Sequence, residues 1–352
     1  MTNKTMRAIL LSGHGDFDKL VYREDVAIPE LEPHQVLLRI GACGLNNTDV
    51  NTRTSWYSKS DDPEDAAWGG SSIAFPLIQG ADAVGTVVAV GGDADTSLLD
   101  RRVMIDVWIR DPYDPLNMDK CHYFGSDING GYAEYAVIDY RNVYPIDSSL
   151  SDAELATFAT SYVTAENMLD RADAGDGDIV LIPGASVGVG SALIQLANRR
   201  GAITVAMASE TKHADVESVG PDALLSRSPA DLSEALLAAI GRDTVDVVAD
   251  VVGGPMFPAL LDVLVRGGRY SCSGAIAGPI VDLDLRTMYL KDLTFTGATI
   301  VPPGTFGRLV RYIENDEIRP LLAEVYPLQD FVRAQEAFIA KQHVGNIVVT
   351  MS

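Results

Sequence analysis

The first part of the chain carries short apolar runs separated by glycine, proline and polar residues. Such runs occur at 7–11 (RAILL), 36–40 (VLLRI), 84–90 (VGTVVAV) and 135–138 (YAVI). Their length and spacing are typical of strands in a compact, mostly β, barrel-like domain rather than of strand–helix–strand units. A polar, acidic and glycine-rich stretch at 58–72 interrupts the pattern and predicts a long surface loop.

From about residue 153 onward the pattern changes to alternating helices and strands. In chain order it predicts a helix at 153–169, a strand at 179–182, a helix at 191–200, and strands at 203–207, 245–250, 269–273 and 293–296 with helical segments between them. This alternation is typical of a parallel sheet covered by helices on both faces. A last short strand at 347–350 follows a helix, and we expect it to return to the first domain.

The length and apolar content of the chain favour two folded domains. A chain of 352 residues corresponds to about two domains of ordinary size. Its hydrophobic content of 47% is enough to fill their cores. No apolar run approaches the ~20 residues that span a bilayer, and the run at 7–11 is too short for a signal-peptide core. We therefore expect a cytoplasmic protein.

The net charge of the chain argues against nucleic-acid partners, and its cysteine content bears on its cellular compartment. The formal net charge of −22, from 49 acidic and 27 basic side chains, repels the phosphate backbone of nucleic acids. We interpret the acidic excess as a solubility surface, with adaptation to a saline habitat as one reason for it. Cys43, Cys121 and Cys272 are far apart in sequence and form no C-x-x-C pair. The sequence thus predicts neither a disulfide framework nor a structural zinc knuckle, and it favours a reducing compartment.

The strongest motif is the glycine-rich segment 184–190 (GASVGVG), which lies between a predicted strand and a predicted helix. Small residues at such a turn let the backbone approach a pyrophosphate, whose charge the amino terminus of the helix then stabilises. An ordinary glycine-rich turn is the alternative, and a valine stands where a glycine is usual. The candidate cofactor-binding residues here are Ala185, Ser186, Val187, Gly188, Val189 and Gly190.

The end of the second predicted strand of this region bears on the choice between NADH and NADPH. NAD enzymes place Asp or Glu there to hold the ribose 2′-hydroxyl, whereas this strand ends at 206–209 (AMAS) without a carboxylate. Ser209 can donate a hydrogen bond to a 2′-phosphate, and Lys212 can neutralise it. We therefore predict NADPH. Glu210 leaves NADH open, because a shift of one residue would restore the NAD pattern, and Lys212 could equally be a solvated helix residue.

Read together with the amino-terminal half, these residues resemble the medium-chain dehydrogenase/reductase superfamily over essentially the whole chain, from 6–8 (MRA) to 344–348 (VGNIV). The resemblance implies an α/β protein with a GroES-like, mostly β catalytic domain at 1–152, completed by 325–352. It implies a doubly wound Rossmann domain with a parallel sheet at 153–324. It also implies a cleft between the domains in which nicotinamide and substrate meet.

The same resemblance argues against a zinc enzyme. Zinc members carry a Cys ligand in a segment similar to 43–49 (CGLNNTD), where this chain has Asn46. Their His-Glu pair is replaced here by Ala81 and Asp82. Catalytic zinc needs three good ligands, and an amide is a poor substitute. The four-cysteine structural lobe is missing as well. We expect no metal, although Asp49 and Asp82 could be imagined around a hard cation.

What remains resembles the zinc-independent branch, the quinone oxidoreductases and 2-enoyl-thioester reductases. The run 44–51 (GLNNTDVN), followed by Trp56 and Tyr57, is similar to their N-x-x-D…Y pattern. The resemblance places Asn46 beside the nicotinamide ribose and Tyr57 toward the substrate, where the matching tyrosine of enoyl reductases is proposed as proton donor or oxyanion stabiliser. Asn46 and Tyr57 are our candidate catalytic residues. Alternatively, Tyr57 is a packing tyrosine at a loop edge, and Asp49 only braces this segment.

The resemblance extends more loosely to further cofactor contacts. Thr164 matches a threonine near the nicotinamide, 250–254 matches the end of a strand that passes the cofactor, and 273–275 matches a turn whose backbone meets the carboxamide. The Gly-Lys pair that often lies near the cofactor is replaced by Gly345 and Asn346. Each match has a purely structural alternative. The candidates from these matches are Thr164, Val252, Ser273, Gly274, Ala275 and Asn346.

Together these features predict an NADPH-dependent oxidoreductase that transfers hydride to an activated C=C bond or a quinone without zinc. Reducing a conjugated alkene needs a hydride at the β-carbon and stabilisation of the enolate oxygen, which a tyrosine or a backbone N–H can provide. Zinc-free carbonyl reduction needs a strong proton donor, and the sequence has no Tyr-x-x-x-Lys pair. That reaction and a non-catalytic NADPH-binding protein remain the alternatives. As partners we expect a small-molecule substrate and a second copy of the chain in a homodimer, with no nucleic acid and no membrane.

Overall fold

The computed structural model describes residues 5–58 and 73–351. The loop predicted at 58–72 therefore lies outside the described residues, apart from its first residue. The chain divides into two compact units, which we call unit 1 (residues 1–160 and 306–352) and unit 2 (residues 161–305). These boundaries differ from those predicted at 152 and 324. Residues 306–324 join unit 1, where the ring of Phe306 lies 5.1 Å from that of Tyr144.

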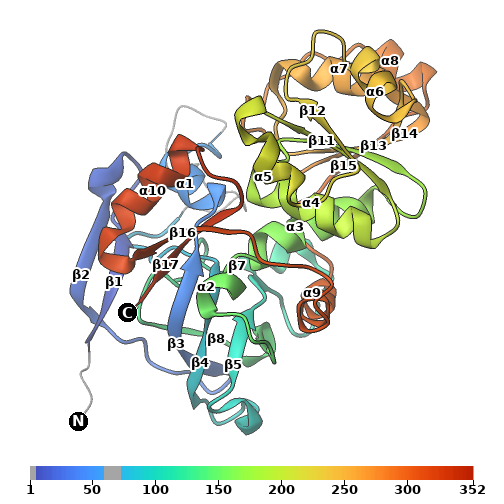
Figure 1. The fold of residues 1–352 in the computed structure, drawn as a ribbon. Coiled ribbons are helices and arrows are strands. Elements are labelled where there is room, and N and C mark those ends of the chain that lie inside the picture. The colour runs from blue at the N-terminus through green and yellow to red at the C-terminus, as the bar shows by residue number, and fades with distance from the viewer. Residues whose placement is uncertain (1–4, 59–72, 352) are drawn as a thin grey trace. The chain divides into compact units, whose positions relative to one another are not determined.

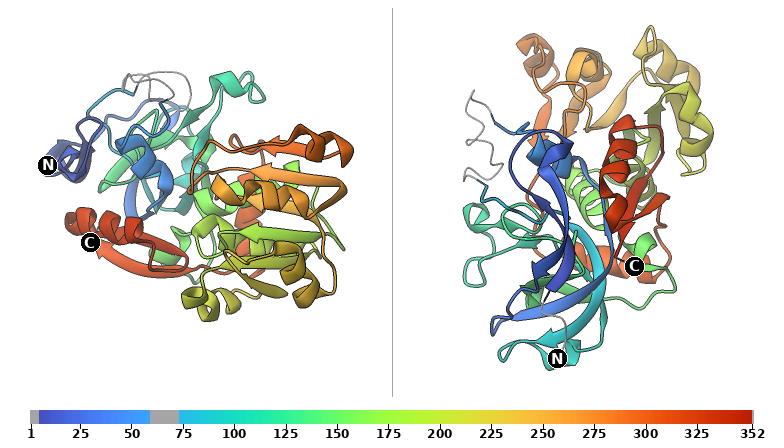
Figure 2. Two further views of the ribbon diagram at one scale, coloured as in Figure 1. Left: turned by 90° about the horizontal axis from the view of Figure 1, so that it is seen from above. Right: turned by 90° about the vertical axis from the view of Figure 1, so that its left-hand side faces the viewer.

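Unit 1 is mostly β. Its strands are β1 (Thr5–Leu11), β2 (Leu20–Ala27), β3 (Gln35–Gly44), β4 (Asp82–Val90), β5 (Arg102–Ile105), β6 (Trp108–Ile109), β7 (His122–Tyr123), β8 (Tyr135–Asp139), β9 (Val143–Pro145), β16 (Leu322–Pro327) and β17 (Asn346–Thr350). A seven-stranded sheet has the order β16-β17-β3-β4-β5-β9, with β8 paired to β3, while β1-β2 and β6-β7 form separate pairs. The carboxyl-terminal strand β17 pairs antiparallel with β3, so it returns to the first domain as predicted (Figure 2).

The period of two in the apolar runs sets the core of unit 1. In β3, Val36, Leu38 and Ile40 are buried, whereas the residues between them are more exposed. These side chains belong to one continuous apolar cluster with residues of β1, β4, β8 and β17. The helices of this unit are α1 (Asn47–Arg53), α2 (Asp152–Leu155), α9 (Thr305–Glu314) and α10 (Phe331–Ala340). Only the first residue of α9, Thr305, is assigned to unit 2.

The single helix predicted at 153–169 is wrong, because the structure has two helices there. The first is α2, and the second is α3 (Ala159–Arg171). Between them the chain passes very close to β3: a Cβ atom on Gly44 would lie 2.3 Å from the carbonyl oxygen of Ala156. This close approach interrupts the helix, and the apolar periodicity of the sequence carries no trace of it.

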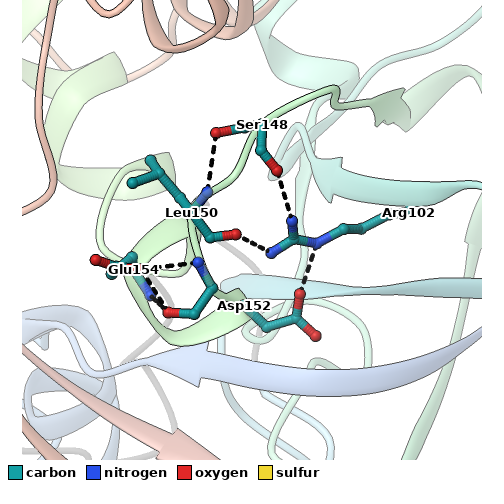
Figure 3. Close-up of polar contacts among 6 residues, drawn as sticks. Arg102, Ser148, Leu150, Asp152 and Glu154 are labelled. Atoms are coloured by element: carbon teal, nitrogen blue, oxygen red, sulfur yellow. Dashed lines mark hydrogen bonds and ion pairs between the residues drawn. The ribbon is translucent and has the colours of Figure 1, made fainter.

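Arg102 fixes the segment that leads into α2. Its guanidinium donates to Oδ1 of Asp152 at 2.7 Å and to the carbonyl oxygens of Ser148 and Leu150 at 3.2 and 2.6 Å (Figure 3). Ser151 caps the helix, since its hydroxyl accepts a hydrogen bond from the backbone N–H of the residue three positions on. Polar contacts therefore fix the position of the start of α2, the helix that precedes α3 in the chain.

Unit 2 is a doubly wound domain. Its strands are β10 (Ile179–Pro183), β11 (Ile203–Ala208), β12 (Ala223–Ser226), β13 (Val245–Asp250), β14 (Leu264–Cys272) and β15 (Thr294–Gly297), and its helices, besides α3, are α4 (Gly188–Arg199), α5 (His213–Glu217), α6 (Leu232–Ile240), α7 (Phe257–Asp262) and α8 (Leu285–Leu290). All strand pairs of this sheet are parallel. Figure 1 shows α3 and α4 on one side of these strands and α6 and α7 on the other.

The strand order of unit 2 places a ligand-binding edge. The order β12-β11-β10-β13-β14-β15 reverses direction between β10 and β13. In open parallel sheets, ligands bind beyond the carboxyl ends of the strands at such a reversal. The predicted α/β fold class is thus confirmed, and the glycine-rich turn follows β10 at this point. None of the helices in the described part of the chain is long and apolar enough to cross a membrane.

Candidate active site

The glycine-rich turn of unit 2 has the geometry of a phosphate cradle. Gly184 has a φ of +70°, which favours glycine. A Cβ atom on Gly190 would lie 2.2 Å from the carbonyl oxygen of Gly184, so only glycine lets α4 begin this close to β10. Val187 has an ordinary φ of −89°, and the turn closes without a glycine there. Gly188, Val189 and Gly190 form the first turn of α4, whose N–H groups have no partners within the helix.

The loops after β13 and β14 lie beside this turn. A Cβ atom on Gly184 would lie 2.7 Å from Cγ2 of Val252. The two loops are tied together, because the N–H of Ala277 donates to the carbonyl oxygen of Val252 at 2.8 Å and that of Ser273 to the carbonyl oxygen of Asp250 at 3.2 Å. The predicted residues of segments 184–190, 252 and 273–275 therefore gather at one edge of the sheet. The Ser273 hydroxyl is itself bound to a backbone oxygen of the protein.

Asp250 holds the loop after β13 in place. Its carboxylate accepts hydrogen bonds from the N–H of Val252 at 2.7 Å, from that of Gly253 at 3.2 Å, and from the hydroxyl of Tyr270 at 2.6 Å. Asp250 is fully buried, so removal of any partner would leave a buried polar group less well satisfied. The loop that carries Val252 is thus rigidly braced.

The end of β11 presents positive charge next to Ser209. Ser209 is half-buried and directly precedes Glu210, whose Oε1 accepts a hydrogen bond from Ser226 at 2.5 Å. Burial lowers the pKa of the Lys212 ammonium, and the nearby charge of Arg227 lowers it further. The N–H of Arg227 donates to the carbonyl oxygen of Ala208 at 2.7 Å. Two cations therefore lie at the end of β11, and only Lys212 was expected from the sequence.

In unit 1, Asp49 braces the start of α1. Its Oδ2 accepts hydrogen bonds from the N–H of Asn46 at 2.8 Å and from the hydroxyl of Tyr132 at 2.6 Å. Asp49 is 3% exposed, and burial raises the pKa of its carboxyl to about 7. The bracing role considered for Asp49 is therefore present. Nδ2 of Asn46 is buried and makes no hydrogen bond of standard geometry among the described residues. The Asn46 side chain faces Asp82, and its hydrogen bonding lowers the pKa of that carboxyl.

Tyr57 lies just beyond α1 and is half-buried. Nδ2 of Asn51 donates to its hydroxyl oxygen at 3.3 Å, and its ring stacks edge-on with Trp56. Burial raises the pKa of the phenol, so the hydroxyl keeps its proton at neutral pH and can act as a hydrogen-bond donor. The structure places Asn46 and Tyr57 at opposite ends of the same short helix.

A second polar cluster surrounds Asp82 at the start of β4. Oδ1 of Asp82 accepts hydrogen bonds from the backbone N–H of Thr160, at 2.8 Å, and from the Thr160 hydroxyl. Oγ1 of Thr160 lies 3.0 Å from the hydroxyl of Tyr123. Burial raises the pKa of Asp82 to about 6 and raises the pKa of Tyr123 well above its ordinary range.

The residues at the expected zinc positions do not form a zinc ligand set. Asn46 offers an amide, Ala81 offers no ligand, and Asp82 is engaged by Thr160. Zinc sites are built from thiolate, imidazole and carboxylate ligands. Among residues 5–58 and 73–351, no group of three or more His, Cys, Asp or Glu side chains is arranged to hold a metal ion.

Two further predicted cofactor residues lie elsewhere. Thr164 is half-buried on α3, one turn after Thr160 on the same side of the helix. Asn346 begins β17 and is buried, and its Nδ2 donates to the carbonyl oxygen of Thr157. This donor of Asn346 therefore serves the packing of unit 1, because it satisfies a backbone oxygen in the segment between α2 and α3.

Sequence reasoning missed Tyr123, Tyr132, Thr160 and Arg227. Thr160 could have been found, because it lies four residues before Thr164 and so shares its helix face. Tyr123 lies in a two-residue strand and Arg227 follows a four-residue strand, and neither belongs to a recognisable motif. Only the folded chain brings Tyr132 within reach of Asp49, 83 residues away in sequence.

Two family models match the chain. The alcohol dehydrogenase GroES-like domain matches residues 32–148, within unit 1. The zinc-binding dehydrogenase model matches residues 188–315, which contain most of unit 2. Both halves of the predicted domain organisation therefore have counterparts among known families.

Individual relatives cover almost the entire chain. A solved structure from Sinorhizobium meliloti 1021, assigned provisionally as an alcohol dehydrogenase, is 47% identical with a TM-score of 0.92, covering 99% of this chain and 97% of its own. A 2-octenoyl-CoA carboxylase reductase solved with NADP and 2-octenoyl-CoA is 25% identical with a TM-score of 0.86, covering 99% and 88%. The quinone oxidoreductase of Mus musculus is 27% identical, covering 96% of this chain and 95% of the mouse protein. The chain belongs to the medium-chain dehydrogenase/reductase superfamily, in its quinone oxidoreductase and enoyl reductase-like branch, and is an oxidoreductase.

Proposed function

We propose that the protein uses NADPH to reduce an activated C=C bond or a quinone, without zinc. The observation that carries this proposal is the site around α1 and β4. Asn46, Ala81 and Asp82 stand at the zinc-ligand positions, and the acid among them is hydrogen-bonded to Thr160. The names of two relatives, a quinone oxidoreductase and a 2-octenoyl-CoA carboxylase reductase, support the same chemistry.

The carboxyl edge of the sheet in unit 2 fits a dinucleotide. The N–H groups of Gly188, Val189 and Gly190 would receive the pyrophosphate, and the close approach that Gly190 permits forms the cradle. Ser209 and Lys212, with Arg227, would receive the 2′-phosphate, because two cations and a hydroxyl favour a dianion. Glu210 is engaged by Ser226, which supports NADPH over NADH. When bound, the cofactor supplies the hydride.

In this proposal Tyr57 stabilises the substrate's oxygen. As hydride reaches the β-carbon of an enone, negative charge develops on the carbonyl oxygen. A neutral phenol hydroxyl directed at that oxygen lowers the barrier, since a hydrogen bond to the developing charge is stronger in the transition state than in the ground state. Asn46, whose buried Nδ2 makes no hydrogen bond of standard geometry among the described residues, would orient the nicotinamide half of the cofactor.

Two other functions compete with this one. The relative from Sinorhizobium meliloti 1021 is assigned provisionally as an alcohol dehydrogenase, which favours carbonyl or alcohol chemistry. Against it, Asn46, Ala81 and Asp82 are not a zinc ligand set, and the described parts of the chain have no group of three or more His, Cys, Asp or Glu side chains that could hold a metal ion. A protein that binds NADPH without catalysis is the remaining alternative, and it would show saturable binding without turnover.

The test is a screen of NADPH oxidation with quinones, enones, alkenals and enoyl thioesters, run on chelator-treated protein. We expect turnover of at least one of these classes, unchanged by the chelator, and a product that keeps its carbonyl where the substrate was an alkene. Activity that disappears with a stoichiometric zinc ion would overturn the zinc-free part of the proposal. Saturable binding without turnover on any class would favour the binding protein.

A further inference from the structure

Asp82, Thr160 and Tyr123 form a continuous chain of hydrogen-bonding groups that the role given to Tyr57 leaves unexplained. The carboxylate of Asp82 binds the Thr160 hydroxyl, and Oγ1 of Thr160 lies 3.0 Å from the Tyr123 hydroxyl. Asp82 is 2% exposed, whereas Thr160 is half-buried. A buried acid is thus connected to a phenol through one hydroxyl group.

The direction of these hydrogen bonds depends on whether Asp82 carries a proton. An ionised carboxylate can only accept, so Thr160 must donate its one hydroxyl proton to Asp82, and Tyr123 must donate its own proton to Thr160. A protonated Asp82 can instead donate to Thr160, which then donates to Tyr123. The Tyr123 proton then no longer goes to Thr160. One proton on Asp82 therefore turns Tyr123 from a donor to Thr160 into an acceptor from Thr160.

Tyr123 lies in the same electrostatic environment as Tyr57. Burial raises the pKa of Tyr123, and the charges of Asp82, Asp49 and Tyr57 contribute to the same rise. The ring of Tyr123 is fixed by an edge-on contact with Trp108, with 5.0 Å between ring centroids. The phenol that ends the chain is therefore rigidly held and close enough to Tyr57 for the charge of one to affect the other.

We propose that Asp82, Thr160 and Tyr123 are a relay that supplies the proton of the reduction, with Tyr123 as the group that gives it to the substrate. This inference rests on the proposed reductase function. It separates two tasks: Tyr57 stabilises the developing charge, and Tyr123 delivers the proton that neutralises it. In a site without a metal, such a relay connects the reacting oxygen to a reservoir of protons.

The proton balance of one turnover is closed. With the hydride on the β-carbon, the electron pair of the C=C bond lies on the substrate's carbonyl oxygen. The O–H bond of Tyr123 breaks and its proton passes to that oxygen, while the Thr160 proton moves to Tyr123 and the Asp82 proton moves to Thr160. Asp82 is left as a carboxylate, and the enol tautomerises to the saturated carbonyl product. After product release, a proton from water returns along the same three groups.

Other ionisable groups surround Asp82 and must be separated from it. Four ionisable groups interact electrostatically with Asp82 or with one another: Asp49 of α1, Cys43 of β3, Tyr123 of β7, and Tyr132, which lies before β8. Burial raises the pKa of each of the three uncharged ones, Cys43, Tyr132 and Tyr123, well above its ordinary value. Asp49 is therefore the group whose titration most resembles that of Asp82, and Asp49→Asn is the variant that removes it.

A first measurement tests the relay without any turnover. In protein labelled with ¹³C at the tyrosine Cζ atoms, the Tyr123 signal, assigned by its loss in Tyr123→Phe, should shift between pH 5 and 8 as Asp82 titrates. The shift should disappear in Asp82→Asn and Thr160→Val and persist in Thr160→Ser and Asp49→Asn. Tyr144→Phe is the matched control, because the Tyr144 ring packs on Phe306 in the same unit. A Tyr123 signal that does not follow Asp82 in folded parent protein overturns the relay.

The second measurement is the kcat for a good substrate in the same variants. Thr160→Val and Tyr123→Phe should each lower kcat by ~10²-fold, the effect of losing a general acid, while NADPH binding stays unchanged. Thr160→Ser should restore kcat to within a few fold of the parent, since it keeps the hydroxyl. If both variants keep the parent kcat, the relay is wrong and the proposed function stands. If the parent reduces neither alkenes nor quinones while the NMR coupling is present, the proposed function fails, and the relay fails with it as a proton supply.

Discussion

The hydroxyl of Tyr132 donates a hydrogen bond of 2.6 Å to Oδ2 of Asp49, an atom that also accepts the N–H of Asn46 at 2.8 Å. This contact joins the segment before β8 to the start of α1 around a buried acid. Burial raises the pKa of Asp49 from 3.8 to about 7. The folded protein therefore holds a proton on Asp49 over a range of pH in which the unfolded chain has lost it.

The first prediction follows from this proton. The stabilising contribution of Asp49 is complete below about pH 4 and is lost as pH rises through about 7, because the folded state binds more protons in that window. Asp49→Asn should flatten the fall in the free energy of unfolding across this range, by an amount on the order of a few kcal/mol. Denaturant unfolding at pH 5 and pH 8 measures it. The raised pKa of Asp82 makes stability fall with pH in the same direction, so Asp49→Asn should keep part of this pH dependence. If the free energy of unfolding falls equally in the variant and the parent, Asp49 is ionised at neutral pH.

A second prediction concerns the glycine that lets α4 start against β10. Gly190→Ala places a Cβ atom 2.2 Å from the carbonyl oxygen of Gly184, so the turn must shift. We expect NADPH binding to weaken by at least ~10-fold, as the N–H groups move away from the pyrophosphate, and the melting temperature to fall. Gly175→Ala in the same unit is the control, since its Cβ would meet no atom within 4 Å. Unchanged NADPH affinity in Gly190→Ala would remove the cradle from the account.

The third prediction tests the preference for NADPH. Ser209→Asp should reverse the order of affinities by accepting a hydrogen bond from the 2′-hydroxyl of NADH and repelling the 2′-phosphate, a swing of ~1–3 kcal/mol. Arg227→Ala should weaken NADPH binding and leave NADH binding unchanged. Arg286→Ala, which removes an exposed arginine paired with Asp284 on α8, should change neither. Isothermal titration of both cofactors decides; equal affinities in the parent protein would count against Ser209 as the selecting residue.

The fourth prediction isolates the Tyr57 hydroxyl. Tyr57→Phe should lower kcat on an activated alkene by ~10²-fold or more, because the hydroxyl acts where charge develops in the transition state. NADPH binding should be nearly unchanged. Asn46→Ala should differ by weakening cofactor binding. Steady-state kinetics and fluorescence titration separate the two effects, with Tyr144→Phe as control. Parent-level turnover by Tyr57→Phe would make Tyr57 a packing residue.

The parts of the fold that sequence could predict are those with a local signal. The apolar alternation at Val36–Ile40 predicts the strand there, and the glycine residues at 184–190 predict a turn with close backbone approach, which the structure has. The break between α2 and α3 could not be predicted, since its cause is a contact with Gly44 more than a hundred residues earlier. The expected homodimer and cytoplasmic location stay predictions.

Part of the candidate site also carries a local pattern. Asn46 and Tyr57 lie in one continuous segment and could be proposed from its pattern, and their roles stay predictions. Asp82, Thr160 and Tyr123 are brought together from β4, α3 and β7, and only the folded chain places their oxygens within hydrogen-bond distance. Polar networks of this kind carry no periodic signal, because each member is a single residue in its own element.

For an unsaturated carbonyl substrate, we expect hydride to go to the carbon–carbon double bond and not to the carbon–oxygen double bond. The most direct measurement uses an α,β-unsaturated aldehyde with NADPH carrying deuterium at C4 of the nicotinamide, followed by NMR of the product. We expect deuterium on the β-carbon and an intact aldehyde. Deuterium on the former carbonyl carbon, in an allylic alcohol, would contradict it and would establish carbonyl reduction as the activity of this site.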